Sequence, residues 1–150
     1  MITVLIIEDE MKTAKALKQS IEDSKLDVDV LRIVQSVKGA LKWFETNEAP
    51  DLIFSDIQLA DGLSFEIYKQ IEIFSPIIFC TAFDEYAIDA FKANGIDYLL
   101  KPIDEEKLNQ SLEKFQKMKN IFGKTTSNES DRSKLESILE KFVSNYKKTI

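Results

Sequence analysis

Five times along this sequence, a short run of apolar residues is followed by a segment whose apolar residues recur at helical spacing. The short runs are continuously apolar rather than alternating, which is typical of strands buried on both faces of a parallel sheet. Strictly alternating strand and helix units place helices on both of those faces. The sequence therefore predicts an α/β fold, built as a doubly wound parallel sheet. The expected strands are residues 2–7, 28–34, 52–55, 77–80 and 96–100, and the expected helices begin near residues 11, 37, 65, 85 and 104.

Polar residues at the predicted helix ends indicate where the helices start and stop. Ser36, Ser64 and Asp84 precede helical segments and are predicted N-caps. Asn94, followed by Gly95, is predicted to end a helix in the left-handed conformation. The predicted inward-facing residues of three helices are Phe65, Ile67, Ile71 and Phe74, then Ala87, Ala90 and Phe91, and finally Leu108, Leu112, Phe115 and Phe122.

A change in composition near residue 123 predicts the domain organisation. Residues 1–122 contain all five strand and helix units, whereas residues 123–131, with the sequence GKTTSNESD, are polar and without periodicity. We expect the first segment to be one domain and the second a linker. Residues 132–149 then carry a single apolar stripe, which predicts an amphipathic C-terminal helix. Its apolar residues are Leu135, Ile138, Leu139, Phe142, Val143 and Tyr146.

The composition excludes several classes of function. The chain has no histidine, which excludes imidazole catalysis and histidine-ligated metals, and its four glycines form no nucleotide-binding motif. A net charge of −6 opposes binding of nucleic acid by this segment. One cysteine, Cys80, and the absence of a run of about 18 apolar residues favour a cytoplasmic protein without a membrane span.

The polar residues that follow the predicted strands point to a catalytic or binding site. In an open parallel sheet, the carboxyl ends of the strands form one edge, where ligands bind. That edge is predicted to carry Glu8 and Asp9, Asp56, Thr81 and Lys101. Crowded carboxylates repel one another unless a cation neutralises them, and Mg²⁺ is the ion that accepts one or two carboxylates with waters and a phosphate oxygen. A carboxylate, Mg²⁺, a lysine and a hydroxyl are the parts required for phosphoryl transfer, with Asp56 as the candidate nucleophile.

Four segments carry a resemblance to a known family: VLIIEDE, LIFSDIQLADG, IIFCTAFDEYAIDAF and DYLLKPID. Together they resemble the receiver domain of bacterial two-component response regulators over about residues 1–122. The resemblance implies the flavodoxin-like (βα)5 receiver fold, also called CheY-like. The run AFKANGIDYLLKPID further resembles the subgroup whose output is a LytTR-type DNA-binding domain.

The resemblance also implies a role for each matching residue. Asp56 is expected to accept the phosphoryl group, with Mg²⁺ bound directly by Asp9, Asp56 and the backbone carbonyl of Gln58, and through water by Glu8. Thr81 is expected to bond the phosphoryl group, Lys101 to form an ion pair with it through a cis Lys101-Pro102 bond, and Tyr98 to be the aromatic switch.

The implied partners are a sensor histidine kinase as donor and a second copy of the chain. Phosphorylation is expected to drive homodimerisation through the face formed by residues 84–94, 96–100 and the helix after 104. DNA is expected to be contacted only through an output domain that follows the amphipathic helix, and no membrane partner is expected.

Other readings of the same residues remain open. An aspartyl-phosphate hydrolase of the haloacid dehalogenase type needs a second Asp two residues after the nucleophile, where this chain has Gln58. A flavin-binding flavodoxin is opposed by Glu8, Asp9 and Glu10, which repel a flavin phosphate. The third alternative is a receiver that serves only as an interaction module, without phosphorylation. The favoured reading is a signalling switch rather than an enzyme, since it catalyses only its own phosphorylation and dephosphorylation.

Overall fold

A parallel five-stranded sheet forms the centre of the computed structural model, which describes residues 1–122 apart from the side chains of Ile88, Phe91 and Phe122. The strand order is β2-β1-β3-β6-β7, and every neighbouring pair is parallel. The predicted doubly wound α/β fold is confirmed, because this order reverses direction between β1 and β3. The strands are β1 (Ile2–Ile7), β2 (Val28–Val34), β3 (Leu52–Ser55), β6 (Ile77–Thr81) and β7 (Gly95–Leu100).

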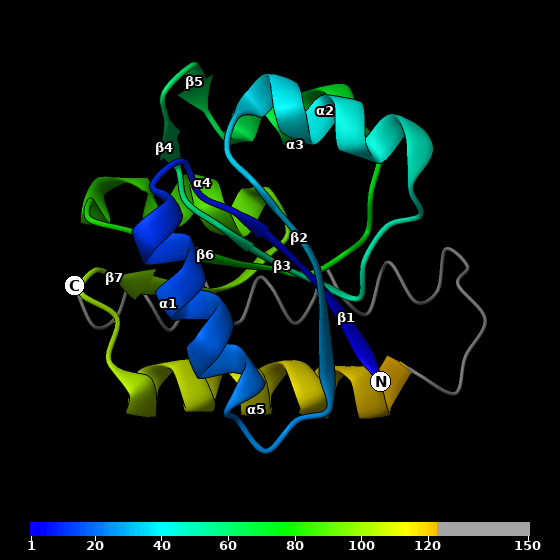
Figure 1. The fold of residues 1–150 in the computed structure, drawn as a ribbon, viewed down its shortest axis with the longest axis vertical. Helices are drawn as coiled ribbons and strands as arrows, with labels where there is room; N and C mark the ends of the chain where they lie inside the picture. Colours follow the sequence, from blue (N-terminus) through cyan, green and yellow to red (C-terminus); the bar gives the residue numbers. More distant parts are fainter. Residues whose placement is uncertain (123–150) are drawn as a thin grey trace.

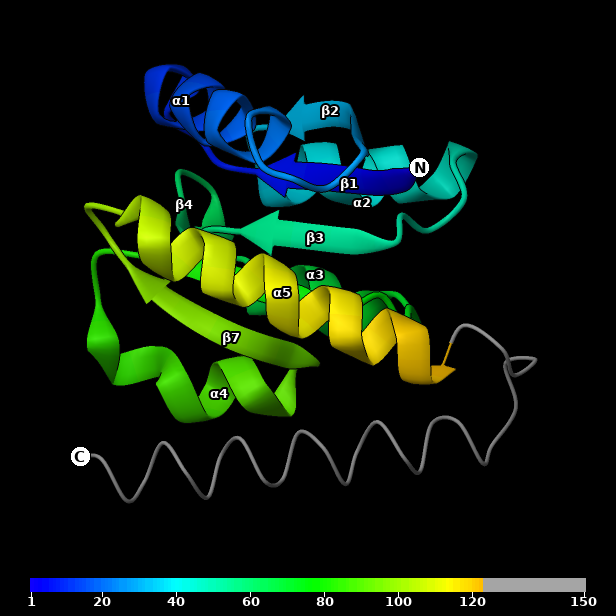
Figure 2. The ribbon, with the colours of Figure 1, turned by 90° about the horizontal axis from the view of Figure 1, so that it is seen from below.

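Helices cover both faces of this sheet (Figures 1 and 2). Helices α1 (Met11–Glu22) and α5 (Glu105–Phe122) pack on one face, and α2 (Val37–Thr46), α3 (Phe65–Gln70) and α4 (Ala87–Lys92) pack on the other. A short 3₁₀ helix, η1 (Asp84–Tyr86), precedes α4.

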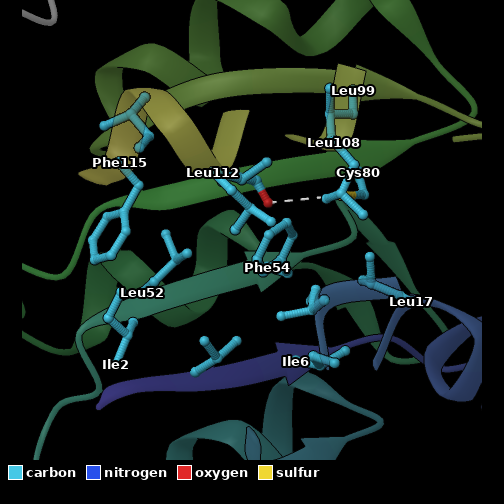
Figure 3. Packing of buried hydrophobic residues seen from close by; sticks show 14 of the residues in the cluster. Ile2, Ile6, Leu17, Leu52, Phe54, Cys80, Leu99, Leu108, Leu112 and Phe115 are labelled. Atoms are coloured by element: carbon cyan, nitrogen blue, oxygen red, sulfur yellow. Dashed lines mark hydrogen bonds between the residues drawn. The ribbon is translucent and has the colours of Figure 1, made fainter. Parts of the chain in front are cut away.

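Side chains of the central strands alternate between two hydrophobic clusters. In β1, Val4 and Ile6 belong to the cluster under α1 and α5, whereas Leu5 and Ile7 belong to the cluster under α2, α3 and α4. The first cluster, drawn in Figure 3, packs Phe54 of β3 among residues from α1 and α5. Both faces of the central strands β1, β3 and β6 are therefore buried, which explains why these strands read as continuous apolar runs. In the outer strand β2, by contrast, only Val34 is buried.

A small antiparallel hairpin, which the sequence did not predict, follows Asp56. Its strands are β4 (Gln58–Leu59) and β5 (Gly62–Leu63), and they are joined by a turn at Ala60 and Asp61. Gly62 has a φ of 145°, which residues with a side chain rarely adopt. The pairing of these two strands depends on contacts that the local sequence pattern does not encode.

Only one of the three predicted N-caps makes a side-chain capping bond. Ser36 caps α2 by accepting a hydrogen bond from the backbone amide of Gly39 at 2.9 Å. Ser64, in contrast, already has helical dihedral angles, and its side chain makes no capping bond. Asp84 starts η1 rather than capping α4, again without a side-chain cap.

The predicted inner faces are correct for most positions. Helix α3 ends at Gln70 and the chain becomes extended at Ile71, so the helical spacing no longer applies and Phe74 is 51% exposed. In α5, Leu108, Leu112 and Phe115 are buried as predicted, together with Met118, which was not predicted. The predictions for Phe91 and Phe122 fall on side chains outside the described residues, and those for the linker and the amphipathic helix fall on residues 123–149, which also lie outside them.

Two backbone features at the ends of β7 agree with the sequence analysis. Asn94 has a φ of 67°, the predicted left-handed conformation. At the other end, the Lys101-Pro102 bond is cis, as the resemblance implies. Within residues 1–122, no helix is long and apolar enough to cross a membrane.

Candidate functional site

The sheet topology brings the predicted site residues to one edge. Asp9 follows β1, Asp56 directly follows β3, Thr81 ends β6 and Lys101 directly follows β7. Because β1 pairs with β3, β3 with β6 and β6 with β7, the four strand ends are consecutive neighbours. Residues that are as much as 93 positions apart in the chain, Glu8 and Lys101, thereby come into contact.

Three carboxylates form the acidic part of this edge. One oxygen each from Glu8, Asp9 and Asp56 lies within 4.8 Å of the others. Glu8 and Asp56 are buried, with 3% and 8% of their surface exposed, and Asp9 is half-buried. Carboxylate oxygens at this spacing suit a small divalent cation, and Mg²⁺ in particular, because its remaining ligands come from water and phosphate. The donor set therefore fits Mg²⁺.

Lys101 lies between two of the carboxylates. Its ammonium donates to Glu8 Oε1, and to Asp56 Oδ2 at 2.9 Å. The other oxygen of Asp56, Oδ1, accepts a hydrogen bond from the backbone amide of Ile57 at 2.6 Å. Both oxygens of Asp56 are thus held in fixed directions, which orients the carboxylate of the candidate nucleophile.

Burial and neighbouring charges shift the pKa values of Glu8 and Lys101. Burial raises the pKa of Glu8 to about 7, against the opposing effect of its hydrogen bond with Lys101, and Asp9 and Asp56 raise it further. Burial by itself would lower the pKa of Lys101, but its bonds to Glu8 and Asp56 outweigh that effect and raise it. Lys101 consequently stays cationic, and the charge of the Glu8 carboxyl varies near neutral pH.

Thr81 presents a hydroxyl that is ready for a ligand. The residue is fully buried, and among the residues that the structure describes its Oγ1 has no hydrogen-bond partner. Buried hydroxyls without a hydrogen-bond partner are uncommon, and within residues 1–122 Ser64 and Tyr68 share this arrangement with Thr81. Its place at the end of β6, beside the end of β3, suits an oxygen-rich group bound at Asp56.

Tyr98 lies on β7, two residues before Leu100, which is the register partner of Thr81. It pairs with Phe79 in the sheet register, is half-buried, and donates its hydroxyl to the backbone carbonyl of Phe83 in the loop after β6. Tyr98 therefore contacts the loop after β6, and its role as the aromatic switch stays a prediction.

Gln58 has a partner that the sequence analysis missed. Its side-chain amide donates to the hydroxyl of Tyr86 in η1 at 3.2 Å. The two residues are 28 positions apart on different connections, so no local spacing relates them. Only the packing of η1 against the loop after β3 brings them together.

Comparisons with known proteins point in one direction. A sequence model described as the response regulator receiver domain matches residues 4–113. The chain is 40% identical over 122 residues to the sensory transduction protein LytT of Bacillus anthracis, covering 79% of this chain and 49% of that protein. It is 33% identical over 122 residues to the sensory transduction protein LytR of Streptococcus mutans, covering 79% and 50%. The chain thus spans about half the length of the curated relatives it matches.

Solved structures show the same likeness. The response regulatory domain of mrkE from Klebsiella pneumoniae superposes with a TM-score of 0.67 at 30% identity, covering 77% of this chain and 95% of that one. The signal receiver domain of a Luxo repressor protein from Vibrio parahaemolyticus superposes with a TM-score of 0.71 at 24% identity, covering 85% and 98%, which shows the fold alone.

Proposed function

Because the chain belongs to the response regulator receiver domain family, with LytT and LytR proteins among its relatives, we propose that it is a phosphorylation-controlled switch whose phosphoacceptor is Asp56. The donor is the phosphohistidine of a sensor histidine kinase, since the chain itself has no histidine. The observation that carries the proposal is the pairing of Asp56 with Lys101 beside the carboxylates of Glu8 and Asp9.

Phosphoryl transfer requires the carboxylate of Asp56 to attack phosphorus. A phosphorus–oxygen bond forms to Asp56 while the phosphorus–nitrogen bond of the donor breaks, and the electron pair stays on the imidazole nitrogen. Lys101 leaves the carboxylate to face a phosphoryl oxygen, and the Thr81 hydroxyl donates to another. The chain supplies positioning and charge neutralisation, which are the main sources of catalysis in this reaction.

Mg²⁺ has a defined place in the proposal. Asp9, Asp56 and the backbone carbonyl of Gln58 are the proposed direct ligands, and Glu8 acts through water. When bound, the ion neutralises charge on the phosphoryl oxygens. The fit rests on three carboxylate oxygens within 4.8 Å of one another.

The proposed output uses the face formed by α4, β7 and α5. Phosphorylation adds about two negative charges at Asp56, and Thr81 and Lys101 follow them by shifting the loop after β6 and the end of β7. Tyr98 turns inward as Thr81 moves. We propose that this face then forms a homodimer and that, through residues 123–131 as a linker and 132–149 as a helix, it controls a LytTR-type DNA-binding domain in the longer protein.

The experiment that tests the proposal is phosphorylation in solution. Acetyl phosphate or a cognate kinase, with Mg²⁺, is expected to add one phosphoryl group by intact-mass measurement, and Asp56→Asn is expected to prevent it. Asp84→Asn, an exposed Asp outside the acidic cluster, is the matched control and should be labelled like the wild type. Equal labelling of the Asp56→Asn variant would place the acceptor elsewhere. No labelling of the wild type would instead favour an interaction module that works without phosphate.

A further inference from the structure

The hairpin of β4 and β5 is fastened to the rest of the domain at both ends. At its tip, Asp61 accepts hydrogen bonds from the backbone amides of Val37 and Lys38 at 2.8 and 3.1 Å. These bonds lower the pKa of the Asp61 carboxyl. At its base, the side chain of Gln58 donates to the hydroxyl of Tyr86 at 3.2 Å. The segment that follows the phosphoacceptor is therefore tied both to α2 and to η1.

The ring of Tyr86 is held by aromatic packing. It lies against Phe65 of α3 with ring centroids 6.1 Å apart, and Phe65 in turn lies 5.5 Å from Phe79 of β6. Tilted aromatic pairs at these separations are favourable. The ring is thus anchored in the cluster under α3 and α4, and its hydroxyl joins η1 to Gln58.

The connection from β6 to α4 is consequently held from two sides. On one side, Tyr98 of β7 donates to the backbone carbonyl of Phe83, and on the other, Gln58 donates to Tyr86. Thr81, at the start of this connection, has a buried hydroxyl that makes no hydrogen bond within the described residues 1–122. In the proposed switch, the connection after β6 moves together with Thr81. This connection is therefore restrained by hydrogen bonds that do not involve Thr81 itself.

We infer that the hydrogen bond between Gln58 and Tyr86 is a latch that holds the loop after β6 in its unphosphorylated position. The inference rests on the proposed function, in which Thr81 moves toward a phosphoryl group on Asp56 and draws this loop with it. A bond that exists in only one of two states opposes the change by its own free energy. Loss of one neutral hydrogen bond of this kind shifts such an equilibrium roughly two- to tenfold.

Beryllofluoride, which mimics the phosphoryl group on an aspartate, is the probe for the test. The full chain is saturated with Mg²⁺ and titrated with beryllofluoride, and the backbone amide signals of Thr81 and Phe83 are followed by NMR. Tyr86→Phe keeps the ring and removes the hydroxyl, and Gln58→Met keeps the length and removes the donor. Each is expected to lower the half-saturating concentration roughly two- to tenfold, and the double variant to lower it no further.

Matched measurements separate the latch from a merely structural role. Tyr68 is a second tyrosine of the cluster under α3 and α4, and its ring lies 6.1 Å from that of Phe79. Within residues 1–122, its hydroxyl makes no hydrogen bond to η1 or to the hairpin. Tyr68→Phe should therefore leave the titration unchanged. Mg²⁺ affinity without beryllofluoride should be the same in Tyr86→Phe as in the wild type.

The possible outcomes are distinct. If the wild type responds but Tyr86→Phe and Gln58→Met leave the half-saturating concentration of beryllofluoride unchanged, or raise it, the latch alone is overturned. Additive effects of the two variants overturn the assignment to one shared bond. If Tyr86→Phe fails to fold, Gln58→Met reports the same bond from its other end. Absence of any wild-type response overturns the proposed function and the latch with it.

Discussion

The ammonium of Lys101 lies 2.9 Å from Oδ2 of Asp56, although their strands are not neighbours in the sheet. Lys101 follows β7, Asp56 follows β3, and β6 runs between them. The lysine side chain therefore crosses the end of β6, where Thr81 lies. One cation compensates a buried carboxylate in the unphosphorylated protein and is already beside the place where a phosphoryl group would be added.

Replacing Lys101 by methionine should lower stability in the absence of divalent cations. The change leaves Glu8 and Asp56 buried without their counter-charge, which costs about 1–3 kcal/mol after allowance for the partial exposure of Lys101. Urea denaturation at pH 7.5 measures the loss. Lys69→Met, which breaks an exposed pair with Glu66, should change stability by less than about 0.5 kcal/mol. Equal effects of the two changes would contradict the assigned role of Lys101.

The raised pKa of Glu8 should make stability depend on pH. The pKa rises from 4.5 to about 7 on folding, so between these values the folded state binds more protons than the unfolded state. Stability from this group is therefore complete below about pH 4.5 and is lost as the pH rises to about 7. Urea denaturation at pH 5 and pH 7.5, without divalent cations, measures the slope. Glu8→Gln should flatten it, and an unchanged slope would assign the dependence to other groups.

Thr81→Val should separate stability from response. The hydroxyl of Thr81 is buried and has no hydrogen-bond partner in the described part of the chain, so its removal should leave the unphosphorylated domain as stable as the wild type, or up to about 1 kcal/mol more stable. The response to beryllofluoride should weaken, because the hydroxyl is the proposed donor to the phosphoryl group. Thermal unfolding and the NMR titration are the two measurements.

Ser111→Ala is the control for that comparison. Ser111 is also fully buried, but its hydroxyl donates to Asp97. Removing it should destabilise the domain by about 1–3 kcal/mol, since the carboxylate loses a buried donor. A loss of similar size in Thr81→Val would show that the Thr81 hydroxyl has a structural partner.

Gly95→Ala should destabilise the domain for a steric reason. A Cβ at this position would lie 2.4 Å from the backbone oxygen of Ala90 and 3.1 Å from the side chain of Phe79. Because a carbonyl in α4 cannot move without shifting the helix, the loss should be about 1–3 kcal/mol by urea denaturation. Gly39→Ala meets the hydroxyl of Ser36 at 2.9 Å, the end of a side chain, and should lose less. The reverse order would contradict the close approach at Gly95.

Deleting residues 124–150 tests the predicted domain boundary. The remaining chain keeps every strand and helix of the described structure, so phosphorylation at Asp56 should be unchanged. Self-association should change if the predicted helix at 132–149 pairs between chains, which sedimentation velocity measures. Loss of folding, seen as loss of the cooperative thermal transition, would show that the boundary at residue 123 is wrong.

The sequence predicted the sheet and most of the residues at its edge, for identifiable reasons. Buried strands require continuous apolar runs, and β1, β3 and β6 were recognised by this feature. The residues after each strand then followed from the rule that parallel strands share one carboxyl edge. Ser64 and Asp84 were misjudged because a capping residue is recognised by its type, whereas the capping bond depends on dihedral angles that neighbouring packing sets.

Spacing along the chain was thus enough to predict the order of strands and helices, the inward face of most helices and which residues follow each strand. These are local properties, because they depend on spacing within one element. Three features follow from the folded structure alone: Lys101 pairs with both Glu8 and Asp56, the Thr81 hydroxyl has no partner within residues 1–122, and Gln58 reaches Tyr86. These relationships join residues 28 to 93 positions apart, and such contacts are fixed by how the strands pair and the loops pack rather than by any periodicity along the chain.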